Sequence, residues 1–242
     1  MKNQYIGDIG DYGKYSLLKT FSDNGISVGI NWYLTKDDET GNDGRITDYL
    51  DDEKYRCLSP KVFDLMKALV DKIDKSVDDI ATSDIIKDAE YYTDYLETNS
   101  LGWKARKEER DKWFKNSMKC LSKCDLLFCD PDNGSIDENR IRRFNSEKYV
   151  SLKELEQYYN KGKNIVYYCQ RGRRKEEIWN LKKNEMEYLA SVSLRSLTFH
   201  KGTQRAYIFL IHHEDANEYD DIIKRFLNAG WGNWDPPIFT MG

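Results

Sequence analysis

The sequence has 242 residues, a net charge of −4, 39% hydrophobic residues and 13% aromatic residues. So many aromatic side chains in a chain of this length argue against intrinsic disorder. No apolar run approaches the 18 or so residues of a transmembrane helix and no secretory leader is visible, so we expect a soluble cytosolic protein whose five Cys are reduced.

The first half of the chain is expected to combine one strand with a long helical block. Apolar residues recur at helical spacing from position 14 to 21, which predicts a helix. Residues 26–34 are β-branched and aromatic, which predicts a short buried strand. Residues 47–123 carry further apolar stripes at helical spacing among many charges, so we expect a helical insertion there.

From residue 125 onward, predicted strands and helices alternate. The strands are 125–129, 163–169, 192–199 and 205–212, and the helices are 136–144, 151–161, 173–189 and 216–227. This order predicts a single α/β domain over residues 1–242 with a mostly parallel, Rossmann-like sheet. Helices should cover both faces, and the last two strands should form an antiparallel hairpin. The strands that end near Leu34, Cys129 and Cys169 should be neighbours.

The most informative polar stretch is Asp130-Pro131-Asp132-Asn133-Gly134, directly after the predicted strand 125–129. In open α/β sheets, ligands bind beyond the carboxyl ends of the strands. The side chains of Asp130, Asp132 and Asn133 are therefore candidate catalytic groups, and we expect Asp130 to be partly exposed. The alternative is a polar turn whose residue types merely suit its backbone.

A second polar group follows the strand 163–169 and flanks the predicted hairpin. Its members are candidate substrate-binding residues, and we expect those of the basic loop 170–173 and Arg205 to contact substrate phosphates. The full set is Gln170, Arg171, Arg173, His200 and Arg205. The alternatives are a solvated basic loop and a structural histidine. A general-base role for His200 is a further possibility.

The Asp-Pro loop also carries a resemblance. A strand that ends in Asp130-Pro131, then a helix, a strand, a helix and a terminal hairpin, resembles the second half of the amino-methyltransferase fold. In that family the motif is Asp/Asn-Pro-Pro-aromatic, and its first side chain and backbone carbonyl grip the amino group that is methylated. Asp132 and Asn133 depart from the motif, because they stand where the family has proline and the aromatic residue.

The N-terminal segment Gly7–Tyr15 (GDIGDYGKY) extends this resemblance. It is similar to the Gly-Asn-x-Ala-Asp-x-x-Lys-His opening of the adenine-N6 methyltransferases of large-subunit ribosomal RNA. Asp11 and Lys14 match in place and kind. The resemblance implies an S-adenosylmethionine-dependent N-methyltransferase acting on RNA or DNA, with Asp8, Asp11 and Lys14 near the methyl donor. Both Asp-rich loops should lie at the same edge of the sheet, so we expect Asp8, Asp11, Lys14, Asp130 and Asp132 to surround one pocket. The Gly-rich loop that such enzymes carry after the first strand is absent.

Two other functions stay open from the residues alone. Several Asp residues without His suit Mg²⁺, so a metal-dependent nuclease or phosphodiester hydrolase is an alternative. Its ligands would come from Asp8, Asp11, Asp37, Asp38, Asp130 and Asp132. A catalytically inactive nucleic-acid-binding module is the other. The basic runs at 104–123 and 171–175 would serve either of them as a nucleic-acid surface, unless they are simply solvated helix faces.

Overall fold

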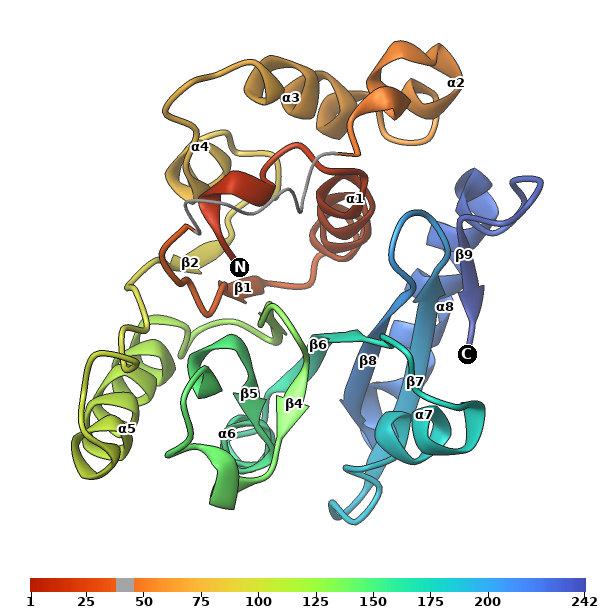
Figure 1. Ribbon diagram of the computed structural model, residues 1–242. Coiled ribbons are helices and arrows are strands. Elements are labelled where there is room, and N and C mark those ends of the chain that lie inside the picture. Colours follow the sequence, from red (N-terminus) through yellow and green to blue (C-terminus); the bar gives the residue numbers. More distant parts are fainter. Residues whose placement is uncertain (38–45) are drawn as a thin grey trace.

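The computed structural model describes residues 1–37 and 46–242. Within these residues the chain has an α/β fold built on a mostly parallel, seven-stranded mixed sheet of order β2-β1-β3-β6-β8-β7-β9 (Figure 1). The parallel strands are β1 (Val28–Asn31), β2 (Glu90–Tyr92), β3 (Leu126–Cys129) and β6 (Asn164–Gln170). The antiparallel pairings join β6, β7 (Val192–Phe199), β8 (Arg205–His212) and β9 (Phe239–Met241). The predicted neighbourhood of β1, β3 and β6 is confirmed.

Side chains of β3 alternate between apolar clusters on the two faces of the sheet. Leu126 and Phe128 pack into one cluster, whereas Leu127 and Cys129 pack into the other. Because both faces are covered, every residue of this strand is buried and apolar. That is the expected composition of a central parallel strand.

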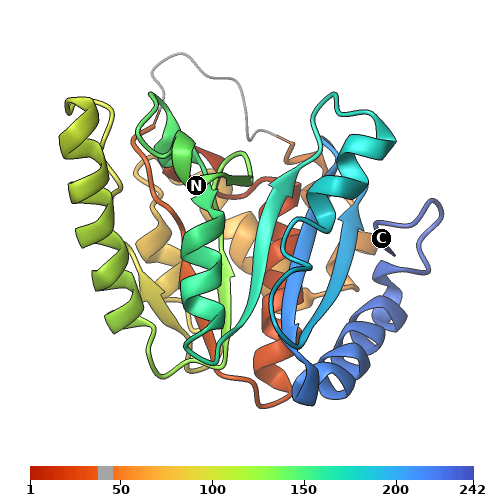
Figure 2. The ribbon, with the colours of Figure 1, turned by 90° about the horizontal axis from the view of Figure 1, so that it is seen from below.

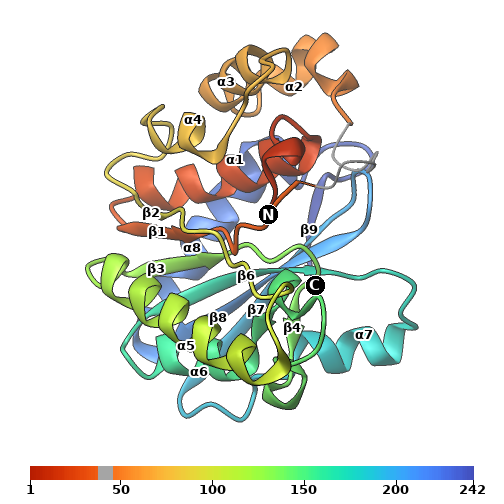
Figure 3. The same cartoon turned by 60° about the vertical axis from the view of Figure 1, so that its left-hand side comes forward.

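Helices lie on both faces of the sheet, as Figure 3 shows. One face carries α1 (Ile9–Asp23), α3 (Pro60–Val70), α4 (Val77–Ala81) and α8 (Ala216–Phe226), with the short α2 (Glu53–Arg56) beyond them. The other face carries α5 (Trp103–Cys120), α6 (Leu152–Tyr159) and α7 (Glu176–Lys183). Helix α1 is sandwiched between the sheet and α3, which explains why most of its side chains are buried.

Three parts of the sequence-based expectation need correction. The block 47–123 is not wholly helical, because Glu90–Tyr92 forms β2 beside β1. A strand of three residues is too short to show an alternating pattern. Residues 136–144 do not form an α-helix: β4 (Ser135–Ile136) pairs with β5 (Val150–Ser151), and 3-10 turns follow at Glu138–Arg140 and Ser146–Lys148. Helix α7 is also shorter than the predicted 173–189.

The remaining elements are short. Turns of 3-10 helix occupy Asn3–Tyr5, Asp48–Asp51 and His213–Asp215, and a π-helical turn follows α8 at Leu227–Trp231. The hairpin β7–β8 has the predicted bounds. No helix in residues 1–37 or 46–242 is both long and apolar enough to cross a membrane. Figure 2 places the N-terminus and α7 at the edge of the sheet where β6 ends.

Candidate functional site

A polar cavity of about 420 Å³ lies where α1 begins, β3 and β6 end, and β8 begins. Its size falls in the range of small-molecule sites. The lining residues are Met1, Tyr5, Asp8, Gly10, Asp11, Lys14, Ile46, Asp130, Pro131, Asp132, Asn133, Tyr168, Gln170, Thr203, Arg205 and Tyr207. The carboxyl ends of β3 and β6 thus open onto this cavity, as expected for ligand sites in open α/β sheets.

Lys14 joins the two sequence segments that form the site. Its Nζ lies 2.6 Å from Asp130 Oδ2 and 2.7 Å from Asp11 Oδ1. All three side chains are at most 7% exposed. Burial alone would lower the pKa of Lys14, but the carboxylates of Asp11 and Asp130 raise that pKa well above its usual value. Lys14 is therefore a fixed cation that holds the Asp130 loop (residues 130–134) against α1.

Asp11 and Asp130 each keep an oxygen that Lys14 does not use. Burial raises the pKa of Asp11 to about 6, although attraction to Lys14 works in the opposite direction. Asp11 Oδ2 is buried, and no described group donates a hydrogen bond to it. Asp130 uses only Oδ2 towards Lys14, and no described residue donates to its Oδ1. These acceptors are suited to a ligand that carries N–H groups.

The turn after Asp130 exposes further acceptors to the cavity. The amino nitrogen of Met1 lies 2.8 Å from Asp132 Oδ1 and donates to the Asp130 carbonyl at 3.0 Å, yet neither Asp132 oxygen receives a hydrogen bond from the described residues. Gly134 has φ +109°, and a Cβ there would meet Cys169 Sγ at 2.7 Å. Glycine is needed because both the backbone angle and the space exclude a side chain. The backbone N–H of Asn133 donates to the Lys148 carbonyl at 3.0 Å, which fixes the turn.

Arg205 closes the other side of the cavity. Its guanidinium lies 4.0 Å from Asp8 Oδ1 and over the rings of Tyr168 and Phe199, at 5.8 and 5.2 Å from their centroids. Asp8 is the N-cap of α1, where its side chain accepts from the Gly10 backbone N–H at 2.8 Å. The absence of a side chain at Gly10 is what lets the guanidinium approach the helix, because a Cβ there would collide with it.

The structure gathers most of the predicted site residues. The expectation that Asp8, Asp11, Lys14, Asp130 and Asp132 surround one pocket is confirmed, and Asn133, Gln170 and Arg205 join them. Other candidates lie off this lining. Arg171 pairs with Gln204 and Glu176, Arg173 is exposed, and His200 Nε2 lies 2.8 Å from Thr240 Oγ1 on β9.

One detail of the expectation is wrong. Asp130 is not partly exposed but only 5% exposed, because Lys14 from α1 covers it. The aromatic walls of the cavity, Tyr5, Tyr168 and Tyr207, were also missed. For Tyr168 the signal was present. It stands two positions before Gln170 on the predicted strand, and residues two apart share a face of a sheet.

The carboxylates of the site are not grouped as a metal centre. No set of His, Cys, Asp and Glu side chains in the described ranges is placed to hold a metal ion. The Lys14 ammonium lies between Asp11 and Asp130, where a cation would otherwise bridge them. Asp37 accepts from the Gln4 backbone N–H at 3.1 Å and does not line the cavity, and Asp38 lies outside the described residues.

Comparison of the chain with protein-family models and with curated protein sequences finds no match to either. The site therefore has to be interpreted from its own geometry. The cavity sets the four carboxylates of Asp8, Asp11, Asp130 and Asp132 against three cations, which are Lys14, Arg205 and the Met1 ammonium. A site with this excess of carboxylates favours a ligand that is cationic or rich in N–H donors.

Proposed function

We propose that the chain is an S-adenosylmethionine-dependent N-methyltransferase that acts on an amino group of RNA or DNA, with its reaction centre at the Asp130 loop. The observation that carries the proposal is the contact of Lys14 Nζ with Asp130 Oδ2 at 2.6 Å. It brings the two segments that resemble the adenine-N6 methyltransferases, residues 7–15 and the Asp-Pro turn, to one cavity.

The order of elements after Asp130 supports the same proposal. After β3 and the short β4–β5 pair come α6, β6, α7 and the hairpin β7–β8. This is the strand–helix–strand–helix–hairpin succession of the second half of the amino-methyltransferase fold. Strand β8 lies between β6 and β7 and runs antiparallel to both.

The residues present fit the methyl donor in charge. When bound, the donor supplies a methyl group carried on a positively charged sulfur. Oδ2 of Asp11 and Oδ2 of Asp132, which receive no hydrogen bond from the described residues, suit the positive charge and the amino groups of such a molecule, and the rings of Tyr168 and Tyr207 add aromatic surface. Asp8 and Asp11 would hold the donor from the start of α1, while Lys14 keeps Asp11 and Asp130 in place.

The Asp130 loop would hold the amino group that is modified. Asp130 Oδ1 is free to accept one of its N–H bonds, since Lys14 occupies only Oδ2. The neighbouring carboxylate of Asp132 lies in the same lining. Its Oδ1 faces the Met1 ammonium, whereas its Oδ2 receives no hydrogen bond from the described residues and is placed to accept a second N–H. Two carboxylate acceptors orient the amino nitrogen and stabilise the positive charge that develops on it.

A thermal-shift and activity experiment tests the proposal. S-adenosylmethionine or its demethylated product at a hundredfold excess over Kd should raise the melting temperature by about 5–10 °C. Transfer of a labelled methyl group to RNA and DNA is then measured for the parent and for Asp130→Asn, which should be inactive. Asp125→Asn, just before the start of the same strand, is the matched control. Stabilisation by Mg²⁺ or Mn²⁺ with no response to the donor would contradict the proposal in favour of hydrolysis.

A further inference from the structure

A second cavity of about 380 Å³ lies on the other side of the segment that follows the Asp130 loop. We call it the cationic pocket. Its lining contains basic and aromatic side chains and no carboxylate, and consists of Ser135, Ile136, Arg140, Arg143, Phe144, Ser146, Tyr149, Arg174 and Lys182. This is the reverse of the acidic lining of the first cavity, so the two sites favour different chemical groups.

Most of the positive charge in the cationic pocket is not neutralised. Among the described residues, the guanidinium groups of Arg140 and Arg143 have no ion pair or hydrogen bond. Arg174 donates to the carbonyls of Gln170 and Arg171 at 2.6 and 2.9 Å and faces no carboxylate. Lys182, by contrast, lies 2.7 Å from Glu185. Unpaired guanidinium groups in one pocket are suited to phosphate oxygens, which they contact in a bidentate manner.

An exposed aromatic platform adjoins these charges. Phe144 is 66% exposed, and the Arg106 guanidinium lies 5.6 Å from its ring. Trp103 is 56% exposed and is contacted in the same way by Arg142 at 5.2 Å. Aromatic rings beside a positively charged groove are typical of sites where unstacked bases pack.

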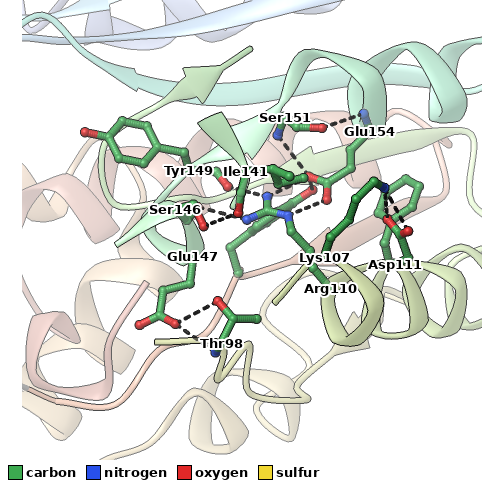
Figure 4. A network of polar contacts seen from close by, with 12 residues as sticks. Thr98, Lys107, Arg110, Asp111, Ile141, Ser146, Glu147, Tyr149, Ser151 and Glu154 are labelled. Carbon is green, nitrogen blue, oxygen red and sulfur yellow. Dashed lines mark hydrogen bonds and ion pairs between the residues drawn. The ribbon is translucent and has the colours of Figure 1, made fainter. Parts of the chain in front are cut away.

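The loop that carries Arg140, Arg143 and Phe144 is held by a buried network (Figure 4). Arg110 of α5 donates to Glu154 at 2.7 and 2.8 Å and to the carbonyls of Ser146 and Tyr149 at 2.8 and 2.6 Å. Glu147 accepts from the backbone N–H groups of Thr98 and Asn99 at 2.9 and 3.0 Å. A loop anchored in this way presents its exposed tip in a fixed position, which lowers the entropic cost of binding.

The linings of the cationic pocket and of the first cavity come from neighbouring residues of the chain. Asn133 lines one and Ser135 lines the other. Arg174, in the cationic pocket, donates to the backbone carbonyl of Gln170, whose residue lines the first cavity. A linear ligand held in the cationic pocket would therefore lie close to the Asp130 loop.

We propose that the cationic pocket binds the phosphodiester backbone of a single-stranded nucleic acid through Arg140, Arg143 and Arg174, with one base stacked on Phe144. A single strand is required because the bases of a duplex are already stacked and do not offer a face to an aromatic side chain. The further step, in which the strand is guided to the Asp130 loop for modification, rests on the proposed function.

Fluorescence anisotropy with labelled 12-nucleotide RNA, the same sequence as DNA, and the corresponding duplex tests this proposal without any methyl donor. The parent should bind the single strands more tightly than the duplex. Arg140→Ala with Arg143→Ala should raise Kd on the order of tenfold or more and make the dependence of log K on log salt less steep by about 1.4, at about 0.7 per lost phosphate contact. Phe144→Ala should raise Kd by about 5- to 150-fold and leave the salt slope unchanged.

Matched controls separate this site from general charge and hydrophobicity. Lys54→Ala with Lys61→Ala removes the same charge from exposed positions of α2 and α3, and Tyr188→Ala removes an aromatic ring that is 61% exposed. Both should bind like the parent. Equal losses in the control and pocket variants, equal affinity for duplex, or no binding by the parent would each overturn the proposal. Because no donor is present, failure of methyl transfer with these binding differences intact would count against the proposed function alone.

Discussion

The ammonium group of Lys14 lies 2.6 Å from Asp130 Oδ2, although 116 positions separate the two residues in the chain. This contact links α1 to the carboxyl end of β3, and both residues line the first cavity. Asp11 holds the same ammonium at 2.7 Å from the preceding turn of α1. One cation thus organises two buried carboxylates, and the stability of the site depends on it.

Replacement of Lys14 by Met should destabilise the fold by about 3–5 kcal/mol, since removal of one member of a buried ion pair leaves its partners uncompensated. Chemical unfolding curves of parent and variant measure this. Lys19→Met is the matched control on the same helix. Its partner Asp23 is half exposed, and loss of such a pair should cost under about 1 kcal/mol. Equal midpoints for Lys14→Met and Lys19→Met would show that the buried cation has no structural role.

The five inner strands of the sheet were predictable from the sequence, because they form compact runs of mainly apolar residues. The three-residue edge strands β2 and β9 were not predicted. The hairpin strands Val192–Phe199 and Arg205–His212 agree with the structure residue by residue. The convergence of Asp11 and Asp130 was predictable as well, since both segments were assigned to one edge of the sheet. What the sequence did not reveal was that Lys14 would bury Asp130, because that depends on where α1 crosses the end of β3.

The segment 137–149 shows why part of the fold was not predictable. Its apolar positions fit a helical spacing, yet the chain follows 3-10 turns and a left-handed residue, Asn145, at φ +62°. The conformation is set by Arg110, which reaches in from a helix 36 positions earlier to the carbonyl of Ser146. A buried arginine has no local signature, and α5 appears in the sequence only as a charged helix.

The raised pKa of Asp11 predicts a specific pH dependence of stability. A carboxyl group with a pKa of about 6 in the folded state and 3.8 otherwise binds its proton more tightly when folded. The Asp11 carboxyl group therefore makes its full favourable contribution to the free energy of unfolding below about pH 4. This contribution is lost as the pH rises through about 6. The stability of the parent relative to Asp11→Asn should fall by on the order of 3 kcal/mol between pH 4 and pH 7.

Unfolding free energies of the two proteins at several pH values measure that difference. Asp23→Asn, at the end of the same helix, is the control, because its half-exposed side chain is screened by solvent and should give a much flatter difference. If the unfolding free energy of the parent minus that of Asp11→Asn stays constant or rises with pH, the surroundings of Asp11 do not raise its pKa in the folded protein.

The network in Figure 4 predicts strong coupling between Arg110 and Glu154. Arg110→Met should cost about 3–5 kcal/mol, because it leaves Glu154 buried without its cation. Glu154→Gln keeps the capping interaction with Ser151 that begins α6. Combined with Arg110→Met, it should recover part of the loss, so that the double variant is destabilised by less than the sum of the two. Additive effects would contradict the coupling.

Lys107→Met, at a more exposed position of the same helix, is the control.

The last prediction concerns Gly10, where stability and ligand binding should respond in opposite ways. A Cβ at this position would lie 2.9 Å from Arg205 Cζ and closer still to Nη1, so the guanidinium must move away from α1. Movement of the far end of a long side chain costs little. Alanine also favours a helix over glycine by up to about 1 kcal/mol. Gly10→Ala should therefore unfold at the same temperature as the parent or slightly above it.

Binding at the first cavity should nevertheless weaken in Gly10→Ala, because Arg205 and Gly10 both line it and the displaced guanidinium would enter the space of the ligand. Titration calorimetry with S-adenosylmethionine should show a loss of affinity close to that of Arg205→Ala. Gly102→Ala, where a Cβ meets nothing within 4 Å, is the matched control and should bind like the parent. If Gly10→Ala keeps full affinity while Arg205→Ala loses it, the approach of the guanidinium to the start of α1 is not what shapes the site.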